Sequence, residues 1–354
     1  MSKKLKIIIA CAVVAIIGLI FLFPKISLYF DGNTQTVNNS ETSFFIKKEM
    51  DLKELAELLK QQGVIDDLEA FIAVGEYKGL TKNNIALGKY TIAPGTKYRN
   101  LLNGFKKNSS GNGNAEVEVS IIFTNCVNIK DIASRVSEKT MLKESELLAF
   151  LEDEKTTRKY NFTPEEFPAM FIPNTYKMYY DVTAQEFVER MAKEFKKFWT
   201  ADRKAKLNAI GLKGESEAVT LASIVYAEQN LVADEWPIIA AVYLNRIEKG
   251  MKLESCPTVR FCDPIGIPSQ PYEKDILRVK DCLYNTYTHK GLPPGPINIP
   301  STKVVDAVLN PVDKEYIFMC AKPDNTHRHN FADDYATHSK NSALFNNYLN
   351  SLRR

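Results

Sequence analysis

The chain has 354 residues, enough for two or three compact units, and 45% of them are hydrophobic and 25% charged, which is typical of globular rather than disordered proteins. Its formal net charge is +3, and Lys3, Lys4 and Lys6 equal that excess, so residues 7–354 are neutral as a whole. Because this remainder has no long Lys/Arg cluster, the composition argues against a nucleic-acid partner.

The first predicted element is an unbroken hydrophobic run at residues 7–23, IIIACAVVAIIGLIFLF. Its 17 residues lie at the short end of the range that spans a bilayer. The lysines before the run predict a cytoplasmic N-terminus and an exported body. No small-residue cleavage site follows Phe23, so the sequence favours an uncleaved anchor over residues 1–30 rather than a signal peptide.

A polar stretch at residues 31–43 indicates a linker, and two similar segments follow it. In the first segment FFI predicts a short strand, and DLKELAELLKQQG predicts a helix that stops at Gly63. Further along, VSIIFTNC and NIKDIASRVSEK repeat this pattern, and DDLEAFIA is echoed by SELLAFLE. Between them GKYTIAPGTKYRNLLNGFKKN predicts a strand, a Pro-Gly turn and a helix. The repeat predicts small stacked α+β modules over residues 44–155, with either a spacer or a binding role.

The segment LASIVYAEQN predicts a helix with an acid at the end of an apolar stripe. Leu221, Ile224 and Val225 lie seven, four and three residues before Glu228, so the four side chains share one helical face. Burial disfavours the charged form of a carboxyl, so its pKa can rise far enough for it to serve as a general acid. On periodicity alone, an acid that simply reaches solvent at the helix end is the commoner case.

A helix over EWPIIAAVYLNRIEK follows, with Asp234 as its expected N-cap and Gly250 as its stop. Asn245 and Arg246 lie near its end, where an Arg either orients a carboxylate or forms an ordinary surface salt bridge. The YNTY loop at residues 284–287 offers stacking faces and hydrogen-bonding groups that suit a sugar, and that suit an ordinary Tyr-rich loop equally well.

Neither the cysteines nor the histidines predict a metal or cofactor site. Five cysteines lie outside the hydrophobic run, without CxxC or HxxxH spacing. They are Cys126, Cys256, Cys262, Cys282 and Cys320. Export permits a disulfide; Cys256 and Cys262 are close enough in sequence to pair, with Cys282 as a competitor, and the other two are expected to be small buried residues. His329 and His338 have no evident third ligand.

Four motifs, in one order, resemble the YceG-like family, the MltG-type endolytic murein transglycosylases. They are LASIVYAEQN, AAVYLNRIEKGMKLESCPTV, YNTYTHKGLPPGPI and HNFADDYATH. The resemblance covers residues 44 to the end, and the family also has an N-terminal anchor. It implies an α+β fold with a transmembrane helix, LysM-like modules at residues 44–155 and a mixed α+β catalytic domain at residues 156–354.

The activity implied by the resemblance is cleavage of the MurNAc–GlcNAc bond within nascent peptidoglycan strands. The products would carry 1,6-anhydro-MurNAc ends, and the cut would terminate strand elongation. The implied location is the bacterial inner membrane, with one span and an extracytoplasmic catalytic domain. Peptidoglycan strands are the implied substrate, and cell-wall synthases are the implied protein partners.

The family's catalytic acid falls on Glu228. The positions that match its cleft residues are Asn245, Arg246, Thr258, Tyr284, Asn285, Thr286, Tyr287 and His329. Two departures are visible, because Tyr226 and Cys256 stand where the family has acids. One acid/base group suffices when the muramic C6 hydroxyl attacks. Two alternatives remain, namely a non-catalytic glycan-binding scaffold and a muramidase that activates water with Asp263, Glu273 or Asp275 as a second carboxylate.

Overall fold

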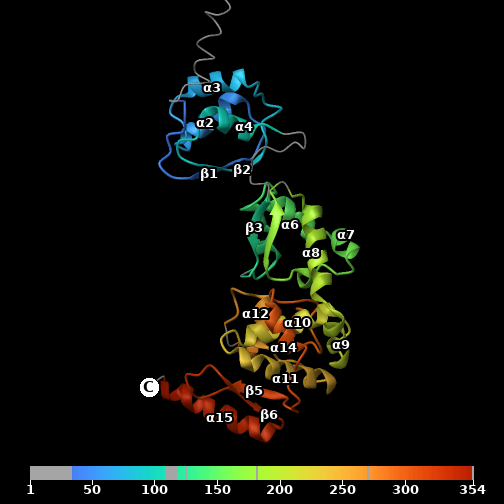
Figure 1. Cartoon of the computed structure of the whole chain (residues 1–354). Coiled ribbons are helices and arrows are strands. Elements are labelled where there is room, and N and C mark those ends of the chain that lie inside the picture. Colours follow the sequence, from blue (N-terminus) through green and yellow to red (C-terminus); the bar gives the residue numbers. More distant parts are fainter. Residues whose placement is uncertain (1–33, 108–117, 125, 181, 269–270, 353–354) are drawn as a thin grey trace, which may run out of the picture. The chain divides into compact units, whose positions relative to one another are not determined.

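The computed structural model describes residues 34–107, 118–124, 126–180, 182–268 and 271–352 (Figure 1). The expected anchor at residues 1–30 lies outside this part of the chain, and no helix within it is both long and apolar enough to cross a bilayer. The described residues form a mixed α+β protein with small two-stranded sheets, as the sequence predicts. The described residues divide into two compact units, one running to Val119 with residues 178–180 added, and one that comprises Ser120–Lys177 and continues from Val182.

The first unit is built from two strands and three helices. They are β1 (Thr42–Ile46), α2 (Leu52–Gln61), α3 (Leu68–Tyr77), β2 (Gly88–Ile92) and α4 (Tyr98–Phe105). β1 and β2 pair antiparallel, with Phe44 opposite Tyr90. A reciprocal capping box of Asp51 and Glu54 starts α2. Gly63, at a φ of 67°, supplies the left-handed residue that follows the helix, so the predicted stop is confirmed.

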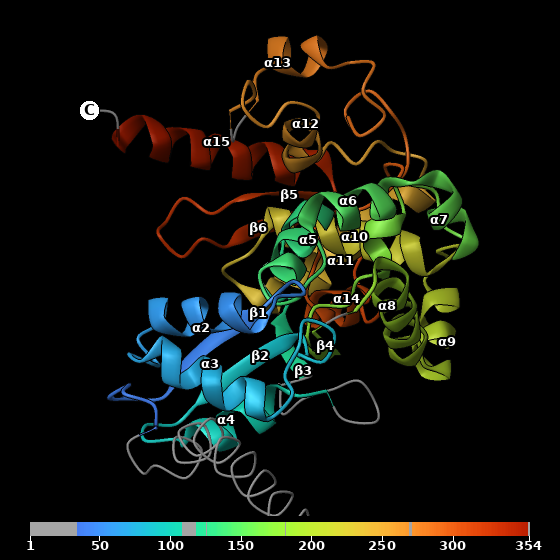
Figure 2. The same cartoon turned by 90° about the horizontal axis from the view of Figure 1, so that it is seen from above.

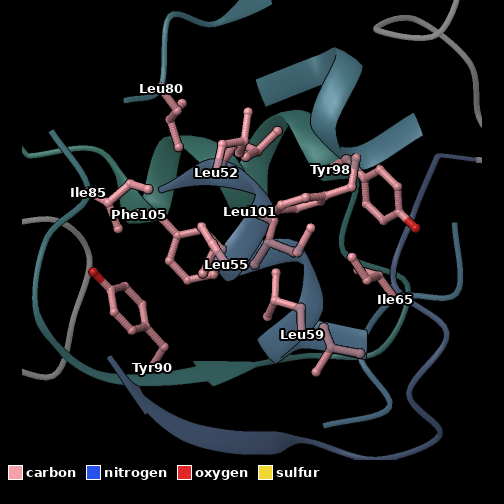
Figure 3. Close-up of a cluster of buried hydrophobic side chains, with 14 of the residues drawn as sticks. Leu52, Leu55, Leu59, Ile65, Leu80, Ile85, Tyr90, Tyr98, Leu101 and Phe105 are labelled. Atoms are coloured by element: carbon pink, nitrogen blue, oxygen red, sulfur yellow. The ribbon is translucent and has the colours of Figure 1, made fainter. Parts of the chain in front are cut away.

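The first unit has a hydrophobic core of its own, shown in Figure 3. Leu55 and Leu59 of α2 are fully buried, and so is Phe105 of α4. The Tyr90 ring of β2 meets the Phe105 ring edge-on, at 4.7 Å between centroids. A closed core of this kind is what allows a small module to be stable by itself.

The remaining elements lie in the second unit, apart from the first residues of β3 and the last residues of β4, which belong to the first unit. In chain order they are β3 (Glu118–Ile122), α5 (Ile129–Ser137), α6 (Glu144–Glu152), α7 (Glu154–Lys159), η1 (Phe167–Met170), β4 (Thr175–Tyr179), α8 (Ala184–Phe198), α9 (Ala201–Ala209), α10 (Glu215–Glu228), η2 (Ala233–Glu235), α11 (Trp236–Glu248), α12 (Cys256–Cys262), α13 (Glu273–Arg278), α14 (Thr302–Val308), β5 (Phe318–Ala321), β6 (His329–Ala332) and α15 (Tyr335–Leu352). Here β3 pairs with β4, and β5 pairs antiparallel with β6.

The predicted repeat is visible in the order of the elements. A strand, two helices, a second strand and a helix occur as β1-α2-α3-β2-α4. The same types of element recur as β3, α5, α6, β4 and α8, with α7 and η1 inserted before β4. In each case the two strands pair with one another. β3 and β4 therefore lie on opposite sides of residue 155, and the domain boundary placed there stays a prediction.

Helix α10 lies at the centre of the part that carries the candidate site, in contact with η1, α11, α12 and α14 (Figure 1). The predicted stripe of Leu221, Ile224 and Val225 is buried, and the burial extends to all of residues 218–225, which the stripe did not indicate. A helix that packs against neighbours on every side is hydrophobic all round. Glu228 is its last residue, as the sequence predicts.

The helix that follows begins later than predicted. α11 starts at Trp236, after the short 3-10 turn η2, and Asp234 does not cap it. Asp234 instead forms an ion pair with Arg328 at 2.9 Å. The predicted stop is confirmed, because Gly250 follows the helix with a φ of 65°. At the end of the chain, α15 packs along the β5–β6 hairpin (Figure 2).

Candidate active site

Gln229, the residue after Glu228, fixes the turn at the end of α10. Gln229 ends α10 in an extended conformation and is 3% exposed. Its side-chain oxygen accepts hydrogen bonds from the backbone N–H groups of Leu231 and Val232, at 3.1 and 3.0 Å. The Gln229 side chain thus pairs with the backbone N–H groups of the turn that follows α10. Glu228 therefore projects from a fixed backbone.

One oxygen of the Glu228 carboxyl is held by two donors. Tyr243 Oη donates to Glu228 Oε1 at 2.8 Å, and Ser255 Oγ donates to the same oxygen at 2.5 Å. Within the described part of the chain, Oε2 has no hydrogen-bond partner. Because Oε1 accepts two hydrogen bonds, the proton of the neutral acid belongs on Oε2, and Oε2 is the atom available to a ligand.

The surroundings raise the pKa of Glu228. Burial is the largest cause, because removal from water disfavours the carboxylate. The hydrogen bonds from Ser255 and Tyr243 and the charge of His329 oppose it and lower the pKa, in that order, but the net shift is upward. The side chain therefore keeps its proton to a higher pH than an ordinary glutamate.

A substitution at Ser255 tests this balance. Ser255→Ala removes the strongest influence that lowers the pKa of Glu228, so the pKa should rise further. The protonated carboxyl band, followed by difference infrared spectroscopy against Glu228→Gln, should persist to higher pH. Tyr243→Phe serves as the comparison and should produce a smaller shift in the same direction. A shift to lower pH in either variant would contradict the assignment of these bonds.

Glu228 lines a cavity of about 440 Å³, large enough for part of a sugar chain. Its walls come from α10 and α11, from the segment before α12, from β5 and β6, and from α15. Four of the predicted site residues line it: Glu228, Arg246, Tyr287 and His329. The neighbouring wall is mostly apolar and includes Phe318 of β5 and Phe345 of α15.

A second cavity of about 430 Å³ lies at the other end of α10, beside Gly214, Glu215 and Ser216. Its two acids are occupied by structural partners. Glu215 forms an ion pair with Lys204 at 3.1 Å, and Glu166 accepts a hydrogen bond from a backbone N–H. The cavity at the Glu228 end of α10 is therefore the better candidate for acid catalysis.

Thr258 and Thr286 lie behind the cavity wall and hold Ser255 in place. Both are buried, and their hydroxyl oxygens are 2.8 Å apart. Thr286 Oγ1 accepts a hydrogen bond from the Ser255 N–H at 3.0 Å, and Thr258 Oγ1 donates to the Ser255 carbonyl at 2.8 Å. These two predicted residues thus act on Glu228 through Ser255.

Asn285 and Tyr284 also lie outside the cavity lining. Asn285 is fully buried and donates to the carbonyls of Ile276 and Val279, which fixes the loop after α13. The Tyr284 ring packs on Phe261, at 4.5 Å between centroids. The YNTY loop therefore contributes one side chain, Tyr287, to the cavity, and its hydroxyl contacts Cys256 Sγ at 3.3 Å.

Asn245 and Arg246 join α11 to the strand side of the cavity. Asn245 donates to the carbonyls of Lys314 and Tyr316, at 2.7 and 2.9 Å. The Arg246 guanidinium, 9% exposed, donates to the Ile317 carbonyl at 2.7 Å and to the Leu253 carbonyl at 2.8 Å. Backbone carbonyls, rather than a surface carboxylate alone, are thus the main partners of Arg246.

The predicted second carboxylates do not reach the cavity. Asp263 pairs with Arg278 at 3.1 Å, Asp275 caps α13, and Glu273 lies exposed in the first turn of that helix. Among the described lining residues, the other acid is Glu254, which pairs with Arg246 at 3.2 Å. The sequence did not single out Glu254, because no periodicity places it beside Glu228.

The cysteines pair differently from the first expectation. Cys262 bonds to the competitor Cys282, and Cys256 keeps its thiol. Cys256 and Cys262 stand at opposite ends of α12, and six residues of helix separate their Cα atoms by about 9 Å, beyond the reach of a disulfide. Cys126 is buried as expected, whereas Cys320 is only half-buried and lines the cavity.

The site also depends on residues that the sequence alone did not mark. They are Tyr243, Ser255, Gln229 and Glu235. Glu235 is 2% exposed and accepts a hydrogen bond from Gln229 Nε2 at 3.1 Å. In the sequence, Glu235 is notable only because it comes just before the Trp-Pro start of a helix. That position indicates a helix terminus rather than a functional site.

Fold and site together define a mixed α+β protein with a proton-retaining glutamate in a cavity at the end of its central helix. Residues 44–343 match the family described as the YceG-like family. That match spans most of the chain, so the chain belongs to the YceG-like family, as the four motifs indicate.

Its relatives include two curated proteins named endolytic murein transglycosylase. The Bacillus subtilis (strain 168) protein is 26% identical over 291 residues, which cover 76% of this chain and 75% of that protein. The Streptococcus pneumoniae serotype 2 (strain D39) protein is 21% identical over 296 residues, and the match spans about half of it, 52%. A yceG-like protein from Listeria monocytogenes has the same fold, with a TM-score of 0.56 over 86% of this chain and 99% of that chain, at 22% identity.

Proposed function

We propose that this chain is an endolytic murein transglycosylase that cuts the MurNAc–GlcNAc bond within peptidoglycan strands. The observation that carries the proposal is the Glu228 carboxyl, with a raised pKa, one oxygen held by two donors and the other left for a ligand. Family membership and the names of the relatives support the same class of reaction, a lyase acting on peptidoglycan.

The proposed chemistry begins with proton transfer from Glu228 Oε2 to the glycosidic oxygen. That transfer lets the bond from the muramic C1 to this oxygen break, with the oxygen leaving as a hydroxyl. The C6 hydroxyl of the same muramic residue then bonds to C1 and loses its proton, which leaves a 1,6-anhydro end. No water is consumed, so a second carboxylate that activates water is not required.

A muramidase is the second candidate, because Glu254 lines the same cavity as Glu228. A hydrolase would add one water to each cut, whereas a transglycosylase adds none. Mass spectrometry of products from uncrosslinked glycan strands separates the two. Anhydro ends are expected, with early fragments of mixed length because the cut is internal. Products with reducing muramic ends would establish the muramidase, and intact strands with retained binding would establish a non-catalytic scaffold.

We also propose that residues 1–30 anchor the protein by a single span in the inner membrane of a bacterium. In this arrangement residues 31–43 are a linker, residues 44–155 form LysM-like modules, and residues 156–354 are the extracytoplasmic catalytic domain. The modules would hold the glycan or a cell-wall synthase, so that strand elongation is terminated near the site of synthesis.

The anchor has a direct test. A reporter enzyme fused after Arg354 is expected to be active outside the cytoplasm and inactive within it, because lysines precede the hydrophobic run. The protein should stay in the membrane fraction with its first residues intact. Mature protein that begins after residue 23 would contradict the uncleaved anchor.

A further inference from the structure

His329 is fastened by both its main chain and its ring to a buried carboxylate. Glu235 Oε1 accepts a hydrogen bond from the His329 N–H at 2.9 Å, and Glu235 Oε2 lies 2.8 Å from His329 Nδ1. Glu235 is 2% exposed and does not line the cavity, whereas His329 does. The imidazole therefore stands between a buried carboxylate and the ligand space.

The contact with Glu235 decides which ring nitrogen is available. A carboxylate only accepts hydrogen bonds, so Nδ1 must carry the proton that it donates to Glu235 Oε2. Nε2 of the neutral ring then has a lone pair, and no hydrogen bond occupies it within the described residues. His329 and Glu228 line the same cavity, so the ring lies on the ligand space that the acid also faces.

A single carboxyl would have to serve two different substrate oxygens. It would give a proton to the glycosidic oxygen and then take one from the C6 hydroxyl. Oε1 of Glu228 is already occupied by Tyr243 and Ser255, so both tasks would fall on Oε2. An imidazole on the same cavity allows the two transfers to occur together, because it accepts a proton while Glu228 donates one.

We propose that His329 is the catalytic base of the reaction and that Glu235 is the positioning residue that orients it. This inference rests on the proposed function and assigns the second proton transfer. His329 Nε2 takes the proton of the C6 hydroxyl as its oxygen bonds to C1, while the glycosidic oxygen leaves with the proton of Glu228. His329 then loses one proton to solvent and Glu228 regains one, so the cycle balances without an added reagent.

His329→Asn is the sharpest variant. The asparagine amide N–H₂ stands where Nδ1 stood, so it still donates to Glu235, and only the Nε2 function is lost. We expect the fold to be retained and the release of anhydro-ended fragments to fall by about 10²-fold or more. His289→Asn is the matched control, since His289 uses Nδ1 to contact Thr288 and Asn285 within its own loop and an asparagine amide keeps a group there, so this variant should keep the wild-type rate.

Two further measurements separate a base from a structural residue. Added imidazole should restore part of the rate of His329→Ala in proportion to its concentration, and should not restore Glu228→Gln. An aryl glycoside of the same saccharide, whose leaving group needs no proton, should restore Glu228→Gln and leave His329→Asn slow.

The positioning role of Glu235 can be tested by ring ¹⁵N spectra of His329. In Glu235→Ala the proton of the His329 ring should move from Nδ1 toward Nε2.

The outcomes are distinct. A folded His329→Asn variant at wild-type rate, beside an inactive Glu228→Gln variant, would overturn the base assignment and leave the proposed function standing. Imidazole rescue with reducing rather than anhydro ends would show that the base acts on water, which would overturn the C6 hydroxyl as its target. An unchanged ring tautomer in Glu235→Ala would remove the positioning role of Glu235.

Discussion

Glu228→Gln is expected to leave the protein folded and to slow the release of anhydro-ended fragments toward the upper end of about 10²–10⁴-fold. Glutamine keeps the side-chain oxygen that accepts hydrogen bonds from Tyr243 and Ser255, so the local geometry has its partners. Its amide cannot donate and regain a proton at neutral pH. Glycan binding should persist, because Tyr287, Arg246 and the apolar wall are unchanged.

The same substitution has a predictable effect on stability. Because the pKa of Glu228 is raised in the folded protein, the folded state holds this proton more tightly than the unfolded state. The stability linked to Glu228 is present below the unfolded pKa and is lost as the pH rises through the raised value. At neutral pH the glutamine variant should therefore be at least as stable as the wild type.

The measurement pairs thermal unfolding with fragment release on the same preparations. Glu248→Gln, an exposed change at the end of α11, is the control and should alter neither quantity. A folded Glu228→Gln variant that releases fragments at near wild-type rate would remove Glu228 from the mechanism.

The largest expected loss of stability comes from Arg246→Met. The guanidinium donates to the carbonyls of Ile317, Lys252 and Leu253, and methionine leaves these acceptors without their donor. Each buried acceptor left unpaired costs about 1–3 kcal/mol, so the free energy of unfolding should fall by about 3 kcal/mol. Activity should fall too, because these bonds join α11 to two walls of the cavity.

Denaturant unfolding monitored by circular dichroism would measure the loss. Arg260→Met is the matched control, since Arg260 is exposed, and it should change the free energy of unfolding by less than about 0.5 kcal/mol. Arg246→Lys should fall between the two, because an ammonium cannot reproduce the planar fork of donors. A loss below about 1 kcal/mol in Arg246→Met would mean that water replaces the guanidinium.

Local patterns account for what the sequence predicted well. The glycine stops after α2 and α11, and the position of Glu228 at the end of α10, depend on neighbours within one or two helical turns. Burial of α10 on every side depends on contacts with other elements, among them α11, α12 and α14, and no helical period predicts those contacts. A helix such as α10, whose apolar stripe through Leu221 looks one-sided in sequence, can therefore be packed against other elements on every side.

Local sequence patterns could not identify the hydrogen-bond partners of Glu228. Tyr243 and Ser255 are 15 and 27 residues from Glu228, and Glu235 is 94 residues from His329. Only the fold brings them together. The family resemblance did mark Thr258 and Thr286, but as cleft positions, whereas here they are buried supports of Ser255. A motif thus identifies positions that matter without saying through which atom they act.

The central claim is that Glu228 is protonated when the protein works, and its ionisation can be measured directly. The difference infrared spectrum of wild type minus Glu228→Gln isolates its carboxyl band, which can be titrated in the buffers used for a pH–rate profile. The account predicts a midpoint above the usual value for glutamate, about 4.3, coinciding with the pH at which fragment release declines. A Glu228 carboxyl that is ionised throughout the pH range of activity would contradict it.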